Sequence, residues 1–191
     1  MTEKILKTAS GVIHYWTSES DPGKQTMVFL PGLTADHHLF DKQIEAFEKE
    51  FDLLTWDAPG HAASRPFRLD FSLMDKAVWL HEILEKEGIS RPVLIGQSMG
   101  GYVAQCFMQK FPGEAAGFIS IDSAPLKRSY VTGAEIALLK RTEPMYRAFP
   151  WKSLKSLGVN GCAKNISSST LPLRASSPSL VSTSPFSFST S

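Results

Sequence analysis

The chain has 191 residues, of which 42% are hydrophobic and 20% are charged, so it is long enough to bury the core of one globular domain. Its formal net charge is only +1, which gives no reason to expect a nucleic-acid partner. No window is apolar over a bilayer-spanning length and residues 1–10 lack the apolar core of a signal peptide, so we expect a cytoplasmic protein with no membrane partner.

The first apolar runs predict strands near the amino terminus. An early strand around GVIHYW (11–16) carries His14, and MVFL (27–30) is apolar throughout. The segment LFDKQIEAFEKEF (39–51) then predicts an amphipathic helix. Its apolar residues recur at helical spacing, namely at Phe40, Ile44, Phe47 and Phe51. The run FDLLTW (51–56) follows as the next strand.

A second helix is predicted over SLMDKAVWLHEILEKEG (72–88). Ser72, followed three residues later by Asp75, resembles a capping box at its start, and Gly88 can end it. The apolar stripe of this helix consists of Leu73, Ala77, Leu80 and Leu84.

The last patterned elements are the strand PVLIG (92–96), the helix MGGYVAQCFMQKF (99–111) and the strand AGFISI (116–121). Because the predicted strands are apolar at nearly every position, they are typical of a parallel sheet covered on both faces. The alternation of strands and helices therefore predicts an α/β fold with a mostly parallel open sheet and flanking helices.

The stretch GQSMG (96–100) places a lone serine between glycines, after a predicted strand and at the start of a predicted helix. This is the G-x-S-x-G pattern in the context that presents a serine nucleophile. The turn is so sharp that Ser98 must adopt strained backbone geometry, and the flanking glycines relieve side-chain clashes. The alternative is a glycine-rich turn in which Ser98 only caps the helix.

Two further loops follow predicted strands in the same way. Pro31-Gly32-Leu33 comes directly after the strand 27–30, and Asp57-Ala58-Pro59-Gly60-His61 comes directly after the strand 51–56. All three motifs therefore fall at the carboxyl ends of strands, where an open α/β sheet builds its site.

With PGLT, DAPGH and GQSMGG in this order, residues 10–125 resemble the α/β-hydrolase fold family, specifically its esterase-like and haloperoxidase-like branch. The resemblance implies that Ser98 is the nucleophile and that the backbone N–H groups of Leu33 and Met99 form the oxyanion hole. Such donors stabilise the negative oxygen of the tetrahedral intermediate. The family commonly has His-Gly where this chain has Pro31-Gly32, a difference that removes no backbone donor.

The family pattern is interrupted at the catalytic base. In the family the triad histidine follows the acid along the chain, whereas no histidine follows His81 here. His61 resembles a structural loop residue of the family, His37 and His38 are expected at the surface of a helix start, and His81 is expected in a covering helix. His61 or His38 would replace the base only if the fold brings one of them near Ser98.

The candidate acid is Asp122, which ends the strand 116–121 and is the only aspartate after Ser98. Some relatives with this fold carry the acid at this position. The alternative for Asp122 is a structural carboxylate at a strand end.

We predict three regions along the chain. Residues 1–125 form the α/β core, and residues 126–164 form the start of the helical cap that the family carries after the sixth strand, or else pack on the sheet edge. Residues 165–191 are serine-rich, without acidic residues, and we expect them to be disordered or non-native in origin. The fold would then be incomplete after its sixth strand, and the strand 116–121 would be an exposed edge available for self-association.

The sequence thus predicts a serine hydrolase that acts on an ester or related acyl bond of a small molecule through an acyl-enzyme at Ser98, with an incomplete triad. Carbon–carbon bond hydrolases and cofactor-free haloperoxidases use the same turn, so the substrate is not ranked. The alternative is a non-catalytic fragment or binding scaffold. We predict no cofactor or metal, because Cys106 and Cys162 lack metal-ligand spacing and no phosphate-loop pattern occurs.

Overall fold

The computed structural model describes residues 1–126, which form one sheet with helices on both faces. The strands are β1 (Thr2–Thr8), β2 (Gly11–Thr17), β3 (Thr26–Leu30), β4 (Asp52–Trp56), β5 (Val93–Gln97) and β6 (Gly117–Ile121). The helices are η1 (His37–Phe40), α1 (Asp41–Phe47), η2 (Ala62–Ser64), α2 (Leu73–Lys86) and α3 (Met99–Lys110), where η marks a 3-10 helix. The predicted cap beyond residue 126 and the predicted tail lie outside the described residues.

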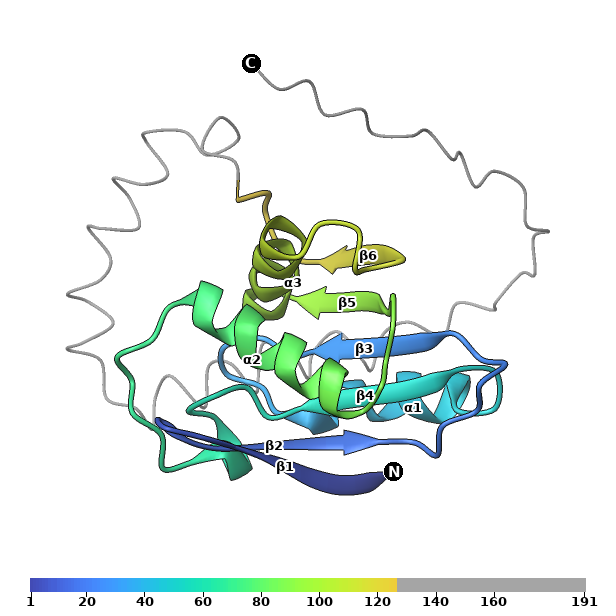
Figure 1. The fold of residues 1–191 in the computed structure, drawn as a ribbon, viewed down its shortest axis with the longest axis horizontal. Helices are drawn as coiled ribbons and strands as arrows, with labels where there is room; N and C mark the ends of the chain where they lie inside the picture. Colours follow the sequence, from blue (N-terminus) through green and yellow to red (C-terminus); the bar gives the residue numbers. More distant parts are fainter. Residues whose placement is uncertain (127–191) are drawn as a thin grey trace, which may run out of the picture. The chain divides into compact units, whose positions relative to one another are not determined.

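The six strands form a mixed sheet in the order β1-β2-β4-β3-β5-β6, as Figure 1 shows. Strands β3 to β6 run parallel to their neighbours among themselves, whereas β2 pairs antiparallel with both β1 and β4. The predicted α/β fold with a mostly parallel sheet is confirmed. Strand β1 was not predicted, because its side chains alternate between exposed and half-buried positions and no continuous apolar run marks it.

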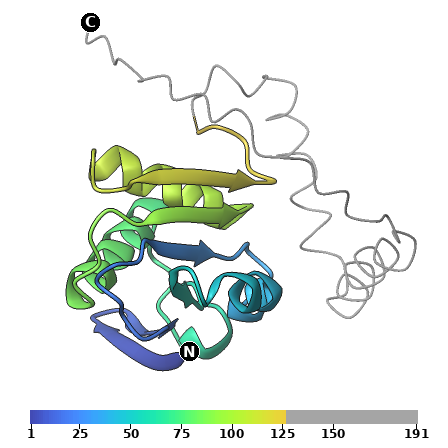
Figure 2. The ribbon, with the colours of Figure 1, turned by 90° about the vertical axis from the view of Figure 1, so that its right-hand side faces the viewer.

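Helices α2 and α3 cover one face of the sheet and α1 covers the other, as the view along the layers in Figure 2 makes clear. The side chains of the central strands alternate between these faces, as the period of two requires. Val28 and Leu30 belong to the larger core beneath α2 and α3, whereas Phe29 belongs to a smaller core with Phe40. This burial on both faces explains why the central strands are apolar at nearly every position.

The predicted start of α2 is confirmed. Ser72 accepts a hydrogen bond from the backbone N–H of Asp75 at 3.3 Å, and the Asp75 carboxylate accepts one from the Ser72 N–H at 2.7 Å, which completes the capping box. The Ser72 hydroxyl also donates to the Asp75 carboxylate at 2.7 Å, and this bond, followed by the one from the Ser72 N–H, lowers the pKa of Asp75. Gly88 follows the helix with φ of 67°, a conformation that glycine adopts readily.

The predicted helix over residues 39–51 was too long. The segment forms η1 and then α1, which ends at Phe47, because the chain must turn before β4 begins at Asp52. Phe47 is consequently 37% exposed, while Phe51 packs edge-on against it, with ring centroids 5.9 Å apart.

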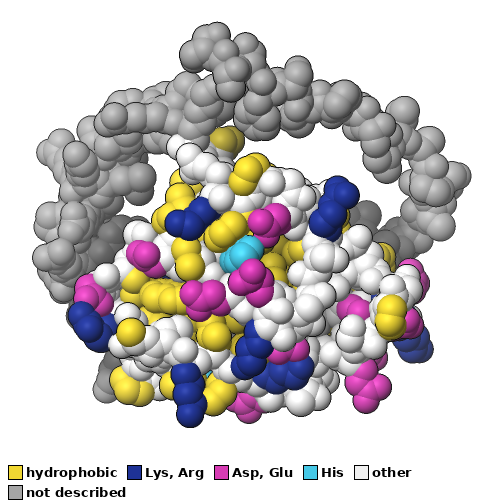
Figure 3. Space-filling view, in the orientation of Figure 1, with side chains coloured by type: hydrophobic (Ala, Val, Ile, Leu, Met, Phe, Trp, Pro, Cys, Tyr) yellow, Lys and Arg dark blue, Asp and Glu magenta, His cyan; other side chains and the backbone are white. Residues whose placement is uncertain are grey.

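Among the described residues, β6 forms one edge of the sheet, as predicted. Two of its apolar side chains remain accessible, Ile119 at 48% and Ile121 at 42%. On the face that Figure 3 shows, acidic and basic side chains are interspersed, in keeping with the small net charge. No helix within residues 1–126 has the length and apolar character needed to cross a membrane.

Candidate active site

The loops that follow β3 and β5 meet at the carboxyl ends of these parallel strands, which the arrowheads mark in Figure 1. A Cβ atom placed on Gly32 would lie 2.2 Å from Oε1 of Gln97 and 3.3 Å from Cβ of Ser98. A side chain at residue 32 would therefore displace the end of the Gln97 side chain and press against Ser98, so glycine suits this close approach of the Pro31–Leu33 loop. The structure brings together these two of the three predicted motifs through direct contact.

Ser98 joins β5 to α3 with φ of 50° and ψ of −115°. A residue with a side chain rarely adopts a positive φ, so this backbone is strained and must be held by its surroundings. Its N–H donates to the carbonyl of Ile121 at 2.8 Å, and its own carbonyl accepts from the N–H of Gly101 at 3.0 Å and from Oγ of Ser123 at 2.7 Å. The Ser98 side chain forms no capping hydrogen bond with α3.

Two glycines around Ser98 let the backbones of β3, β5 and α3 touch. A Cβ atom on Gly96 would lie 2.5 Å from Cα of Gly101, and one on Gly100 would lie 1.8 Å from the carbonyl oxygen of Leu30. Both distances are far below any real carbon contact. The flanking glycines that the sequence motif requires are therefore needed for packing as well as for the turn.

Leu33 and Met99, the predicted oxyanion-hole residues, belong to the two segments that meet at Ser98. Within residues 1–126, neither backbone N–H donates a hydrogen bond to another residue. Met99 is also the first residue of α3, where the helix dipole favours negative charge. Its side chain is buried, at 8% exposure, whereas that of Leu33 is 62% exposed.

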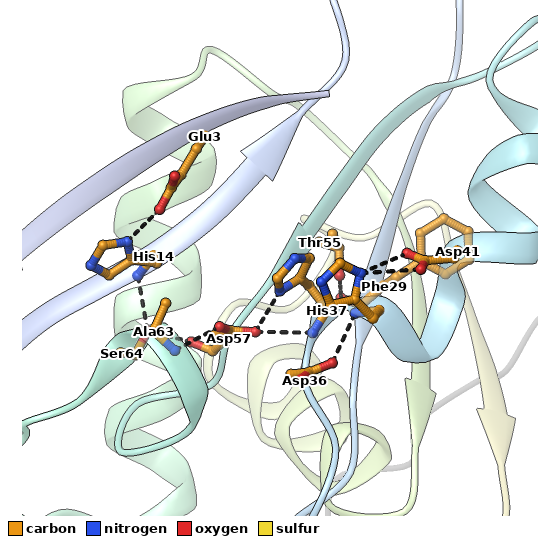
Figure 4. Close-up of polar contacts among 11 residues, drawn as sticks. Glu3, His14, Phe29, Asp36, His37, Asp41, Thr55, Asp57, Ala63 and Ser64 are labelled. Carbon is orange, nitrogen blue, oxygen red and sulfur yellow. Dashed lines mark hydrogen bonds and ion pairs between the residues drawn. The ribbon is translucent and has the colours of Figure 1, made fainter.

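Asp57, which directly follows β4, is fully buried and accepts three hydrogen bonds (Figure 4). Its Oδ1 atom lies 2.9 Å from both the backbone N and the ring Nδ1 of His37, and its Oδ2 atom accepts from the N–H of Ala63 at 2.9 Å. The His37 ring also stacks on Trp16, with centroids 3.6 Å apart. Asp57 thereby links the end of β4 to the start of η1, which is the element that follows the Pro31–Leu33 loop.

The expectation that His37 is a surface residue is therefore wrong. Its side chain is only 20% exposed, because the buried Asp57 carboxylate needs N–H donors and Trp16 covers the ring. A sign of this was present in the sequence, since an aspartate directly after a buried strand must find hydrogen-bond donors in the loops around it.

All five histidines of the chain lie among the described residues, and none of them forms a hydrogen bond there with Ser98. Their partners are Glu3 for His14, Asp57 for His37, Asp41 for His38, the carbonyl of Pro59 for His61, and Glu114 for His81. The two alternatives for the base, His38 and His61, are thus engaged elsewhere through Nδ1. In this part of the chain no three His, Cys, Asp or Glu side chains are placed to hold a metal ion.

Asp122 lies immediately after Ile121, whose carbonyl binds the Ser98 N–H. It has a φ of 53° and is exposed to solvent. Among residues 1–126 its carboxylate forms neither a hydrogen bond nor an ion pair. The structure therefore places Asp122 near the serine turn, but brings it to no histidine.

Lys76 is a residue that the sequence reasoning missed. It lies on α2, is only 3% exposed, and its Nζ atom donates to Sδ of Met99 at 3.1 Å. The same atom lies 5.3 Å from the centroid of the Phe71 ring. Burial lowers the pKa of Lys76 from 10.5 to about 8. The helical spacing contained the signal, because residue 76 lies three positions after Leu73 and four before Leu80, on the apolar face.

Residues 25–141 match the family model described as alpha/beta hydrolase fold. The uncharacterized hydrolase YugF of Bacillus subtilis (strain 168) is 29% identical over 127 residues, which are 65% of this chain and 46% of that protein. Monoacylglycerol lipase abhd6-A of Xenopus laevis is 28% identical over 115 residues, which are 58% of this chain and 34% of the lipase.

A solved structure of the N-acyl homoserine lactonase AidH, complexed with N-butanoyl homoserine, has the same fold. It superposes with a TM-score of 0.60 and 24% identity, covering 72% of this chain and 53% of that chain. The chain spans less than half the length of both curated relatives, 46% of the first and 34% of the second.

Proposed function

Because the chain belongs to the alpha/beta hydrolase fold family, we propose that it is a serine hydrolase in which Ser98 attacks an ester or related acyl bond. The observation that carries this proposal is the strained backbone of Ser98, with φ of 50° at the junction of β5 and α3. Such strain costs on the order of 1–3 kcal/mol and persists where the surrounding structure and a function require it. A serine that served only as a helix cap would have no use for this conformation.

In the proposed reaction, Oγ of Ser98 forms a bond to the carbonyl carbon of the substrate while its proton passes to a water molecule of the solvent, and solvent water returns a proton to the leaving alcohol. The electron pair of the C=O bond moves to the oxygen, which accepts hydrogen bonds from the N–H groups of Leu33 and Met99. Each such donor is worth roughly 3 kcal/mol in the transition state. Collapse of this intermediate expels the protonated alcohol and leaves an acyl-enzyme, from which water releases the acid.

The proposal does not use a histidine of this chain as the base. Within residues 1–126, every hydrogen bond of a histidine ring is with a residue other than Ser98. Asp122 is the candidate acid, because it follows the residue that holds the Ser98 N–H. A carboxylate in that role acts on the base, so its contribution depends on the base being present.

The proposed substrate is a small molecule with an ester or related acyl bond. Two of the relatives support this class by their names, because a monoacylglycerol is a carboxylic ester and an acyl homoserine lactone is a cyclic ester. Both proteins share the fold of this chain at low identity, so the support extends to the type of bond and not to the particular substrate.

A second candidate function is a non-catalytic binding scaffold with the hydrolase fold. The engagement of all five histidines away from Ser98 favours it, because a serine without a base is a weak nucleophile at neutral pH. The scaffold would keep the turn at Ser98 for packing, since the glycines around it bring three backbone segments together.

A fluorophosphonate probe distinguishes the two candidates. Activated serine displaces fluoride from the phosphorus, so the wild-type chain should be labelled and Ser98→Ala should not. Ser90→Ala is the matched control, because Ser90 is an exposed serine outside the site, and this variant should be labelled like the wild type. A wild-type protein that is folded by circular dichroism yet stays unlabelled would refute the serine hydrolase and support the scaffold.

A further inference from the structure

We propose that Lys76 is a positioning residue of the serine site, which acts through Met99 and places a positive charge behind the oxyanion hole. The proposal rests on the proposed function of Ser98. Lys76 would have two effects. It would hold the side chain of Met99, whose N–H is a proposed oxyanion donor, and its charge would stabilise the negative oxygen that forms in the transition state.

The geometry links Lys76 to the reacting centre through one residue. Nζ of Lys76 lies 3.1 Å from Sδ of Met99, and Met99 is the residue directly after Ser98. Four bonds join Sδ of a methionine to its own backbone nitrogen, so these two atoms are at most about 5 Å apart. The ammonium group therefore lies within about 8 Å of the proposed N–H donor.

A charge at this distance affects the reaction, because the path between the two groups is protein and not water. Lys76 is 3% exposed, and Met99 and Phe71 cover its end. At roughly 10 Å and an effective dielectric constant of about 20, the attraction between unit charges corresponds to a rate effect on the order of tenfold. With a pKa of about 8, Lys76 carries this charge at neutral pH.

Packing alone does not account for a lysine at this position. A thioether and an aromatic ring are weak partners for an ammonium group, and burial that lowers the pKa disfavours the charged form. An apolar side chain on the same helix face, such as that of Leu73 or Leu80, would fill the space without this cost. The buried charge of Lys76 thus lowers the stability of the fold, which indicates that the lysine serves the function of the site.

The charged groups nearest to Lys76 in the sequence pair with other residues. In the loop before α2, Arg68 pairs with Asp70, and on α2 itself the carboxylate of Asp75 binds Ser72. The titratable side chains of α3 are Tyr102, Cys106 and Lys110. None of the carboxylates in residues 1–126 forms an ion pair with Lys76, and burial is the cause of its lowered pKa.

The test measures the second-order rate of fluorophosphonate labelling between pH 6 and pH 10. Lys76→Met removes the charge and keeps an apolar side chain of similar length, and Lys86→Met removes an exposed charge from the far end of the same helix as the matched control. At pH 7, Lys76→Met should react on the order of tenfold more slowly than the wild type, and Lys86→Met should react at the wild-type rate. The deficit of Lys76→Met should shrink as the pH rises through about 8, because the wild-type lysine then loses its proton.

Each outcome decides the proposal. Restoration of the neutral-pH rate by Lys76→Arg, which keeps the charge, would support it further. Equal rates for Lys76→Met and the wild type at every pH would overturn it while leaving Ser98 as the nucleophile. A deficit that does not change with pH would overturn the role of the charge and indicate a packing effect. Absence of labelling in the wild type would overturn the proposed function, and this inference with it.

Discussion

Replacement of Lys76 by methionine should stabilise the fold at neutral pH, and this gain should disappear at alkaline pH. The reason is the burial of the ammonium group against Met99 and Phe71, without a carboxylate partner in the described residues. A neutral side chain of similar length avoids the desolvation that the charged form suffers there.

The magnitude follows from proton linkage. Burial lowers the pKa of Lys76 from 10.5 in an unfolded chain to about 8 in the folded state. Between these values the unfolded state binds more protons, so the free energy of unfolding of the wild type rises with pH across this window. The difference of about 2.5 between the pKa values lowers the free energy of unfolding of the wild type by about 3 kcal/mol. This loss is fully present below pH 8 and absent above pH 10.5.

Urea unfolding of both proteins at pH 7, 8, 9 and 10 measures this effect. The free energy of unfolding of Lys76→Met should exceed that of the wild type by about 3 kcal/mol at pH 7, less any packing loss, and the gap should narrow by more than about 2 kcal/mol by pH 10. Burial also raises the pKa of Tyr15 and of Cys106. Both residues are present in both proteins, so their contributions to the pH dependence of unfolding cancel in the comparison.

The control is Lys42→Met, at an exposed lysine of α1 that forms no hydrogen bond or ion pair among the described residues. Its difference from the wild type should stay within about 0.5 kcal/mol at every pH. A constant gap between Lys76→Met and the wild type from pH 7 to pH 10 would refute the reasoning, because Lys76 would then hold its proton equally well in the folded and unfolded states.

Three further predictions concern the packing around the site and the sheet edge. Gly100→Ala should lower the free energy of unfolding by at least about 3 kcal/mol, because its Cβ would lie 1.8 Å from a β3 carbonyl oxygen, and an unchanged melting temperature would contradict this. Asp57→Asn should cost about 2–3 kcal/mol in urea unfolding, since a buried carboxylate that accepts three N–H groups is replaced by an amide, and a loss below about 1 kcal/mol would speak against it. We also propose that the chain self-associates through β6, so Ile119→Lys should weaken concentration-dependent association in sedimentation experiments, and equal association of both proteins would exclude this edge.

Local patterns determined much of the fold. The central strands could be predicted because burial on both faces makes every position apolar, and the start of α2 could be predicted because Ser72 and Asp75 bind each other within one turn. The sharp turn at Ser98 could also be predicted, because its strained backbone depends on neighbouring residues and Gly96 and Gly100 lie two positions away. Strand β1 escaped detection because an edge strand needs apolar residues on only one side.

Contacts between distant segments were decided by the tertiary structure alone. The pairing of His37 with Asp57 joins residues 20 positions apart, and the contact of Lys76 with Met99 joins residues 23 positions apart. No periodicity encodes such contacts, because they depend on how the loops at the carboxyl edge of the sheet pack together. The sequence by itself therefore determined that Ser98 stands in a sharp turn between a strand and a helix, whereas only the tertiary structure decided that the histidines bind other residues and that the buried Lys76 contacts Met99.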